Sequence, residues 1–221
     1  GIGTTSPDAL LTIDKDVSTA YSATDDGAQR SNTNTLLLKN EDGTANSFAQ
    51  IAFDLAGSNQ SIARIVGLND GAATSALAFV TEGSNTKREV MRLDGSGNVG
   101  IGISSPSQML ELSANNGSGV ANVLRFNDAD TGVSAGQTTG RIEFAENDGG
   151  NTTVSAFLEV DTVGTSGGGV MTFGTGSAGA TASERLRIDS YGNVGIGQTT
   201  IIDSASGRKA LTIGGSTSSI I

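Results

Sequence analysis

The sequence predicts an all-β chain made of tandem antiparallel repeat units. Three observations point to this fold class: a long internal repeat, short segments in which polar and apolar residues alternate, and turn-forming dipeptides between those segments. No segment combines the apolar period of a helix with capping residues. We therefore expect an elongated fibre in which the repeat units follow one another along one axis.

A glycine-rich motif marks the repeat and occurs three times. Its copies are Gly-Ile-Gly runs that begin at Gly1, Gly100 and Gly195, with spacings of 100 − 1 = 99 and 195 − 100 = 95 residues. The residues that precede the second and third copies, 89–99 and 184–194, align without a gap. The repeat therefore includes the predicted strand that leads into the motif.

The repeat divides the chain into two full units and the start of a third. Downstream of the motif, the segment 211–213 matches 110–112 after an insertion of a few residues. The residues that should precede the first copy are missing, so we expect the chain to be a piece of a longer repetitive protein. The predicted divisions are unit 1 at 1–99, unit 2 at 100–194 and a partial third unit at 195–221.

Each unit is predicted to contain six short strands. The run from Arg185 to Asp189 alternates polar and apolar residues, as a half-buried strand does. Pairs such as Asp42-Gly43 and Asp70-Gly71 are turn signals between strands. The predicted strands are 9–13, 34–39, 48–54, 61–66, 75–80 and 87–93 in the first unit, and 108–113, 121–126, 139–145, 152–160, 168–173 and 183–189 in the second.

The composition excludes several kinds of chemistry. The chain has no Cys and no His, so it offers no thiolate nucleophile, no imidazole base and none of the usual zinc ligand sets. A Ser-His-Asp triad cannot form within it. We expect no enzyme activity, and we assign no catalytic, cofactor-binding or metal-binding residue and no cofactor.

The apolar content predicts that the chain is not a monomer. Hydrophobic residues make up 36% of the sequence, and the aromatics are 7 Phe, 2 Tyr and 0 Trp. Each predicted strand offers only two or three apolar side chains on one face, too few for one unit to close a thick core. Packing the same face of several identical chains around an axis would bury that face and protect the strand edges.

The net charge of −10 bears on the partners that the chain can have. A strongly acidic chain is a poor general binder of nucleic acid, and it is unlike a basic helix that lies on a membrane surface. No apolar run approaches the ~18 residues of a membrane span, and no signal peptide is visible. We expect no nucleic-acid partner, no membrane insertion, and a virion or extracellular location.

The run from Gly95 to Gly100 spells G-x-G-x-x-G, the pattern of a dinucleotide-binding turn. Such a turn requires a helix after it, whereas Ile-Gly-Ile-Ser-Ser-Pro follows here, and the sister copy at 191–195 lacks the first glycine in register. We interpret the run as a structural turn. Its Gly-Asn pair suits a positive φ, and its Gly-Ile-Gly would let the backbone pass close to another chain.

Acidic residues could suggest two other kinds of site. Asp94 with Asn98, and Asp128 with Asp130, vaguely resemble calcium loops, but the spacing of an EF-hand is absent. Paired carboxylates could also indicate a glycosidase; the candidates are Glu143 with Glu146 and Asp25 with Asp26. We favour turn-forming carboxylates for the first set and solvated faces for the second.

Two arginines and one polar stretch could each have a structural role or a binding role. Arg92 and its counterpart Arg187 alternate with apolar residues, and we expect them to pair with carboxylates across strands or chains rather than to bind a ligand. The polar stretch 14–34 is expected to be a long loop. A spacer is the favoured reading, although loops on a rigid β scaffold are where receptor contacts usually lie.

The run Asp-x-x-Gly-Asn-Val-Gly-Ile-Gly-x-x-x-Pro, followed by a Leu-x-Leu or Leu-x-Ile strand, resembles repeats of bacteriophage tail-fibre and tail-spike proteins. The match covers 94–112 and 189–197 well and 1–13 in part, whereas the third copy lacks the proline. In that family the repeat often lies upstream of an intramolecular chaperone that trims itself off after trimer assembly. The resemblance implies an intertwined or axially packed homotrimer, with no catalytic residues in this region.

Three hypotheses for the function follow. The first is a structural and host-adhesion segment of a phage tail fibre, whose partners are its own copies, other virion tail or fibre proteins, and a host cell-surface glycan or protein. The second is a bacterial extracellular filament or surface adhesin built from the same repeat. The third, less favoured, is a polysaccharide-degrading tail-spike domain.

Overall fold

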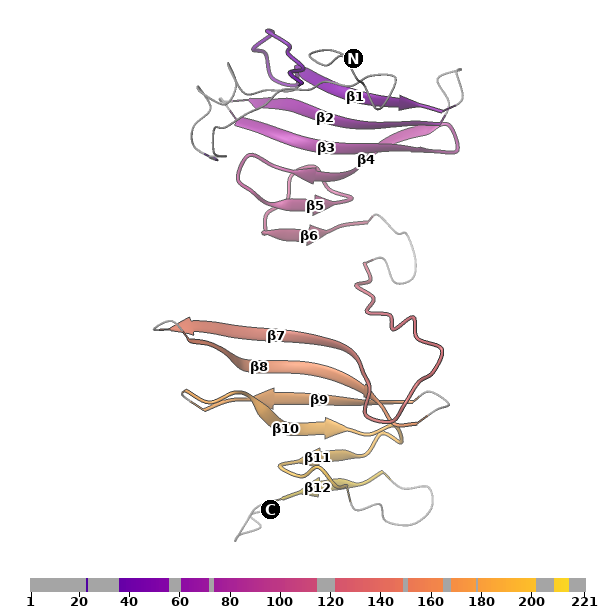
Figure 1. The fold of residues 1–221 in the computed structure, drawn as a ribbon, viewed down its shortest axis with the longest axis vertical. Helices are drawn as coiled ribbons and strands as arrows, with labels where there is room; N and C mark the ends of the chain where they lie inside the picture. The colour runs from indigo at the N-terminus through magenta and orange to yellow at the C-terminus, as the bar shows by residue number, and fades with distance from the viewer. Residues whose placement is uncertain are drawn as a thin grey trace, which may run out of the picture. The chain divides into compact units, whose positions relative to one another are not determined.

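The fold was obtained as a computed structural model. The chain divides into two compact units, 1–123 and 124–221, and each contains one six-stranded sheet (Figure 1). The described residues contain no helix, so none of them forms a helix that could cross a membrane. The described residues are 23, 36–55, 61–71, 74–114, 122–148, 151–164, 168–177, 179–201 and 209–214.

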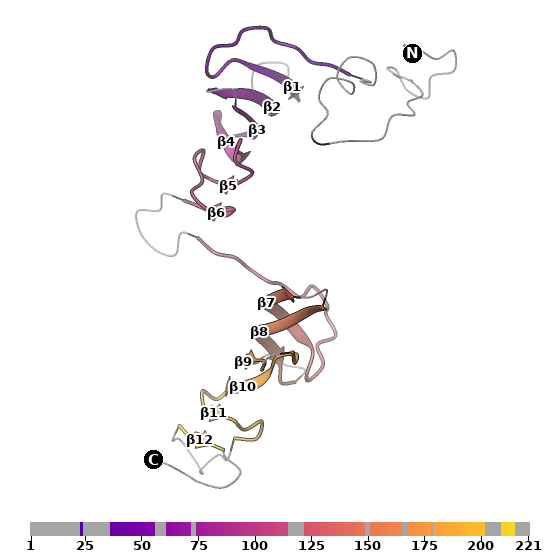
Figure 2. The same ribbon diagram turned by 90° about the vertical axis from the view of Figure 1, so that its left-hand side faces the viewer.

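The first sheet runs through its strands in chain order. Neighbouring strands are antiparallel from β1 to β5, and only the last pair, β5 with β6, is parallel. In the view of Figure 2 the strands succeed one another in this same order. The strands are β1 (Phe48–Asp54), β2 (Ile62–Gly71), β3 (Thr74–Gly83), β4 (Thr86–Leu93), β5 (Val99–Ile101) and β6 (Leu110–Leu112).

The second sheet repeats this topology. Its order is β7 to β12, again antiparallel except for the last pair, β11 with β12, which is parallel. The strands are β7 (Thr138–Asp148), β8 (Asn151–Thr162), β9 (Gly169–Thr175), β10 (Ser183–Ile188), β11 (Val194–Ile196) and β12 (Leu211–Ile213). The all-β class and the dominance of antiparallel pairing are therefore confirmed.

Most of the predicted strands lie where the alternation placed them, with two exceptions among the described residues. The segments 36–39 and 122–126 were predicted to belong to strands, but neither enters a sheet. Their residues are apolar enough for a strand, but no neighbouring strand of their own unit pairs with them. The predicted strand 9–13 lies outside the described residues.

The Gly-Asn-Val-Gly-Ile-Gly motif, interpreted from the sequence as a structural turn, contributes both a turn and a strand to each sheet. Its Val-Gly-Ile part forms a strand inside each sheet, β5 or β11, because the tight turn before it returns the chain antiparallel to β4 or β10. The segment 211–213, counted with the third copy in the sequence, pairs with β11 of the second sheet. The sheets are therefore out of phase with the sequence repeat, whose unit limits stay a prediction.

Candidate functional site: an apolar face on each sheet

One face of the first sheet consists of apolar side chains. Residues that pair directly across strands project from the same face, so the strand register defines the rows that cross the sheet. Five large side chains of these rows are 38% to 55% exposed, whereas the others are half-buried; the five are Ile51, Leu77, Leu93, Ile101 and Leu110. The two rows are Ile51, Ile65, Phe79, Met91, Ile101 and Leu112, and, beside it, Ala49, Gly67, Leu77, Leu93, Val99 and Leu110.

The second sheet carries the same two rows. Seven of their large side chains are exposed, from 37% for Ile188 to 64% for Leu211, and the other four are half-buried. The rows are Ile142, Leu158, Phe173, Leu186, Ile196 and Ile213, and, beside it, Gly140, Val160, Met171, Ile188, Val194 and Leu211. We refer to these rows in the two sheets as the apolar faces.

The opposite face of each sheet is polar at its surface and holds the small core of the unit. In the first sheet Val66, Ala78 and Val80 are buried there. In the second sheet Phe157 is buried, and the guanidinium of Arg141 stacks 3.9 Å from its ring centroid. Charged side chains therefore cover the little core that each unit has, while the apolar faces have no such cover from the described residues.

An ion pair on each polar face depends on a β-bulge. Met91 pairs with Phe79 and Glu89 pairs with Val80, so Val90 is an extra residue in β4. Residues three apart in a regular strand project from opposite faces, but the extra residue brings Glu89 and Arg92 to the same face.

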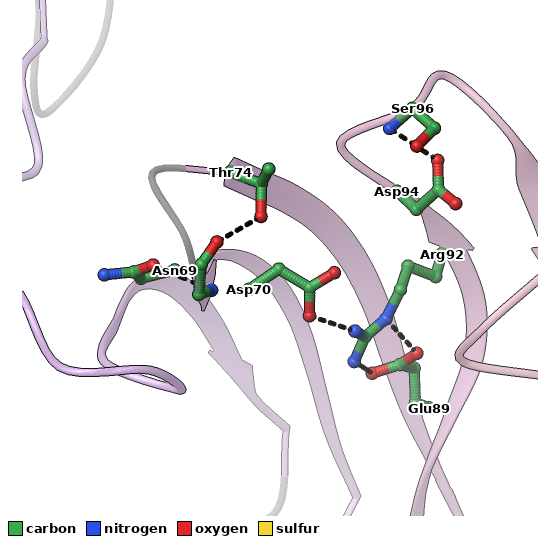
Figure 3. A network of polar contacts seen from close by, with 8 residues as sticks. Asn69, Asp70, Thr74, Glu89, Arg92, Asp94 and Ser96 are labelled. Atoms are coloured by element: carbon green, nitrogen blue, oxygen red, sulfur yellow. Dashed lines mark hydrogen bonds and ion pairs between the residues drawn. The ribbon is translucent and has the colours of Figure 1, made fainter.

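The contacts of this arginine are short and bidentate (Figure 3). Arg92 donates through Nε and Nη2 to the two carboxylate oxygens of Glu89, at 2.7 and 2.8 Å, and through Nη1 to Asp70 at 3.0 Å. The hydrogen bonds that Arg92 donates to Glu89 are the main reason that the pKa of Arg92 is raised, so the guanidinium stays charged. The predicted carboxylate partners are confirmed for this arginine.

The second sheet repeats the bulge and its ion pair. The extra residue is Arg185, and Arg187 donates to both carboxylate oxygens of Glu184 at 2.6 Å. The hydrogen bonds that Arg187 donates to Glu184 are the main cause that raises the pKa of Arg187. In both sheets the bidentate partner lies in the same strand, which the sequence did not indicate because a bulge cannot be read from alternation alone.

In the turn before β5, which we call an aspartate turn, the Asp94 carboxylate accepts hydrogen bonds from the backbone of the turn itself. Asp94 Oδ1 accepts the N–H groups of Ser96, at 2.9 Å, and Asn98, at 2.8 Å, and the backbone N–H of Gly97 donates to the Asp94 carbonyl at 3.0 Å. The amide of Asn98 is the main cause that lowers the pKa of Asp94. Gly97 has a φ of 86°, so the predicted positive φ is confirmed.

The glycines of the motif allow close contacts within the chain. Gly102, with a φ of 76°, donates its N–H to the free carbonyl of the bulge residue Val90 at 3.1 Å. A Cβ on Gly100 would overlap the carbonyl oxygen of Ile103, and one on Gly102 would overlap that of Ser113. Both of these close approaches are to the chain's own backbone, and the expected approach to another chain stays a prediction. Because a β-strand follows the G-x-G-x-x-G pattern, the described residues offer no helix for a dinucleotide.

The acidic pairs do not converge on a site in the described residues. Asp128 and Asp130 form successive turns, in which each carboxylate accepts an N–H two residues on at 2.9 Å, and Gln137 donates to Asp128 at 2.8 Å. No group of three or more possible metal ligands occurs among the described residues.

The glycosidase candidates lie apart. Glu143 and Glu146 are three residues apart in β7, which has no extra residue between them, so they project from opposite faces. Glu143 pairs with Arg141 at 2.7 Å. Asp25, Asp26 and the predicted loop 14–34 lie outside the described residues, apart from Ala23 within that loop.

The sequence analysis did not identify the apolar faces residue by residue. Alternation in each strand gives the candidates, but the register between strands decides which of them align. The signal that could have found them is the match between the two units, in which Met91, Leu93, Val99 and Ile101 recur 95 residues later as Leu186, Ile188, Val194 and Ile196.

Comparisons with known proteins found neither a matching protein family nor a matching curated protein. Several solved structures share similarity with the chain, and two of them are of the carboxy-terminal domain of the bacteriophage T5 L-shaped tail fibre. The one that includes the intramolecular chaperone domain has a TM-score of 0.32 and 14% identity, over 80% of this chain and 62% of that one. The other has a TM-score of 0.30 and 13% identity, over 80% of this chain and 89% of that one.

Proposed function

We propose that the chain is a structural segment of a phage tail fibre, in which three copies pack their apolar faces against one another. The observation that carries this proposal is the pair of matching apolar faces. A folded chain that keeps two rows of exposed and half-buried apolar side chains on each sheet has a surface suited to association. Burying such side chains stabilises an assembly by roughly 25 cal/mol per Å² of apolar surface removed from water.

Identical copies are the occupants that fit these faces best. A repeated self-complementary surface closes most simply by rotation about one axis, which leaves no apolar face free to aggregate. The net charge of −10 gives each copy a repulsion toward the others, so the attraction has to come from apolar contact. Three copies follow from the resemblance of the motif to phage fibre repeats.

Tandem repetition supports a shaft-like role. The apolar faces of the two units have the same rows in the same strand order, so each unit can make the same kind of contact with its copies. In this proposal the segment works as a virion component with host attachment as its purpose, and its partners are other tail or fibre proteins and a host surface glycan or protein. It has no catalytic role.

Two neighbouring residues of β7 test the proposal because they lie on opposite faces. Ile142→Lys places a charge in the apolar face, and we expect the assembly to dissociate by at least tenfold in its dissociation constant. Glu143→Lys changes the polar face of the same strand, where Arg141 keeps Glu159 as a partner at 2.6 Å, and we expect the assembly to persist. Light scattering with size-exclusion chromatography measures both variants; equal association of the two would contradict the proposal.

A further inference from the structure

Two exposed apolar segments precede the first strand of the two sheets. We call Leu36, Leu37 and Leu38 arm 1, and Leu124 with Phe126 arm 2. The side chains of arm 1 are 45% to 58% exposed, and those of arm 2 are 63% and 48% exposed. These are the segments that the sequence predicted as strands and that find no strand partner in their own unit.

Each arm borders a hollow whose other wall belongs to the apolar face of its own unit. In the second unit the hollow measures about 200 Å³ and lies between Phe126 and Ile142, Leu158 and Val160. Gly140 forms the nearest part of the wall, where a Cβ would come within 2.6 Å of the Phe126 Cβ. The absence of a side chain at Gly140 lets Phe126 approach the sheet while the neighbouring space stays open.

The first unit shows the same arrangement at a larger scale. Its hollow is about 1650 Å³ and open to solvent, with Leu37 and Leu38 on one side and Ala49, Leu77 and Leu93 on the other. Polar and charged residues, among them Lys39, Glu41, Asp42 and Asp94, also line it. Ala49 and Gly140 occupy the same row of their sheets, beside the arm. Two units that differ in sequence therefore both combine an arm, a small residue and an open hollow that reaches the apolar face, although the hollow of the first unit also has polar residues in its lining.

We propose that a second copy of this chain fills these hollows, so that each arm closes over apolar side chains of its neighbour. This inference rests on the proposed function and deepens it, since it names the segments that clasp the neighbouring copy. The second copy is the occupant because the hollows are continuous with the apolar faces assigned to self-association. The mainly apolar wall of the second hollow is also a poor fit for charged or sugar ligands, since these would lose hydration and gain few partners there.

A photo-crosslinking amino acid at Leu37 or Leu124 of the full chain tests the clasp. Ser96 and Tyr191 are matched controls, because they occupy equivalent exposed positions in the aspartate turns of the two units. After irradiation, we expect the arm positions to give covalently linked multimers on a denaturing gel at least fivefold more than the controls.

The outcomes separate this inference from the proposed function. If light scattering first shows an assembly and the arm positions then crosslink no more than the controls, the clasp is wrong and the apolar-face assembly stands. If the arm positions crosslink only within single chains, the hollows are filled from their own chain and the clasp is again wrong. If the full chain is a monomer in solution, both the proposed function and the clasp fail.

Discussion

The two units share one turn-and-bulge arrangement but complete it differently. In both, an aspartate turn leads into a short strand, and a glycine N–H caps the bulge carbonyl: Gly102 to Val90 at 3.1 Å, and Gly197 to Arg185 at 2.8 Å. The units differ in how the turn asparagine contacts the segment before the last strand. Asn98 donates to the carbonyl of Pro106 at 3.3 Å, whereas Asn193 accepts the N–H of Ala210 at 2.9 Å.

This difference shows which parts of the arrangement are fixed by geometry. The second unit carries an insertion and lacks the proline, yet its last strand pairs with β11 in the same register as β6 pairs with β5. The asparagine amide can act as a donor or as an acceptor, so it adapts to either connection. The glycine that caps the bulge has no such freedom, because positive φ and close backbone leave no room for a side chain.

Alanine at the capping glycine should have the largest effect, and it should be larger in the first unit. In Gly102→Ala the new Cβ would overlap the Ser113 carbonyl oxygen, whereas in Gly197→Ala it would lie 3.0 Å from that of Gly214. We expect the free energy of local opening to fall by about 3 kcal/mol or more for the first and by about 1–2 kcal/mol for the second.

The hydrogen-exchange rates of two backbone amides measure the local opening of each unit separately. The N–H of Ser113 donates to Ile101, and that of Gly214 donates to Ile196, both at 2.9 Å. Each substitution should speed the exchange of the amide in its own unit. Equal effects in the two units would show that positive φ alone, rather than the close carbonyl, sets the cost.

Substitution of the turn asparagine should reverse the order of the two units. Asn193 is 2% exposed, and its side chain donates to Asp189 at 2.9 Å besides accepting from Ala210. Asn98 makes two longer bonds of 3.3 Å. We expect Asn193→Ala to cost about 2–3 kcal/mol and Asn98→Ala about 1 kcal/mol, measured by urea unfolding at fixed chain concentration. A larger loss for Asn98→Ala would mean that the proline contact matters more than burial.

Low pH should destabilise both aspartate turns. Of the differences between the two units that are predicted here, the difference in this effect should be the smallest. Burial raises the pKa of Asp189, but the bonds from Asn193 and Tyr191 and the charge of Lys209 outweigh it and lower the pKa. Bonds from the Asn98 amide and its neighbours lower the pKa of Asp94 without such a charge. Because both folded-state values are depressed, the stability they contribute is complete above the ordinary value of 3.8 and is lost as the pH falls through the folded-state pKa.

Salt separates the two aspartates. Adding salt screens Lys209, so the pKa of Asp189 should rise toward its ordinary value while that of Asp94 changes less. An NMR titration of the two carboxyl carbons at low and high salt measures this. If salt changed the pKa values of Asp94 and Asp189 equally, the charge of Lys209 would not contribute to the lowered pKa of Asp189.

The sequence predicted the strands whose register could be inferred from alternation, and it failed where pairing depended on other residues. The strand at 183–188 follows directly from polar and apolar alternation. The arms were predicted as strands because their residues suit a sheet, but a strand forms only beside a partner. The Val-Gly-Ile strand was not predicted, because the glycines of the surrounding motif suggest a turn. The glycine in the middle of the strand instead allows close packing of the backbone.

The candidate site, too, could be predicted from the sequence only where alternation within a strand was enough. The sequence predicted that the two arginines pair with carboxylates, since a half-buried arginine needs such a partner. Their location three residues earlier in the same strand needed the bulge, which alternation does not reveal. Likewise, a low apolar content indicated a shared core, but only the strand register aligned its residues into two continuous rows.

The mass of the full chain in solution tests the central claim, that the apolar faces are buried between copies, most directly. Sedimentation equilibrium at micromolar concentration gives this mass independently of molecular shape. We expect three times the mass of one chain, retained on dilution. A stable, monodisperse species with the mass of a single chain would contradict the account, because both apolar faces would then have to remain in water.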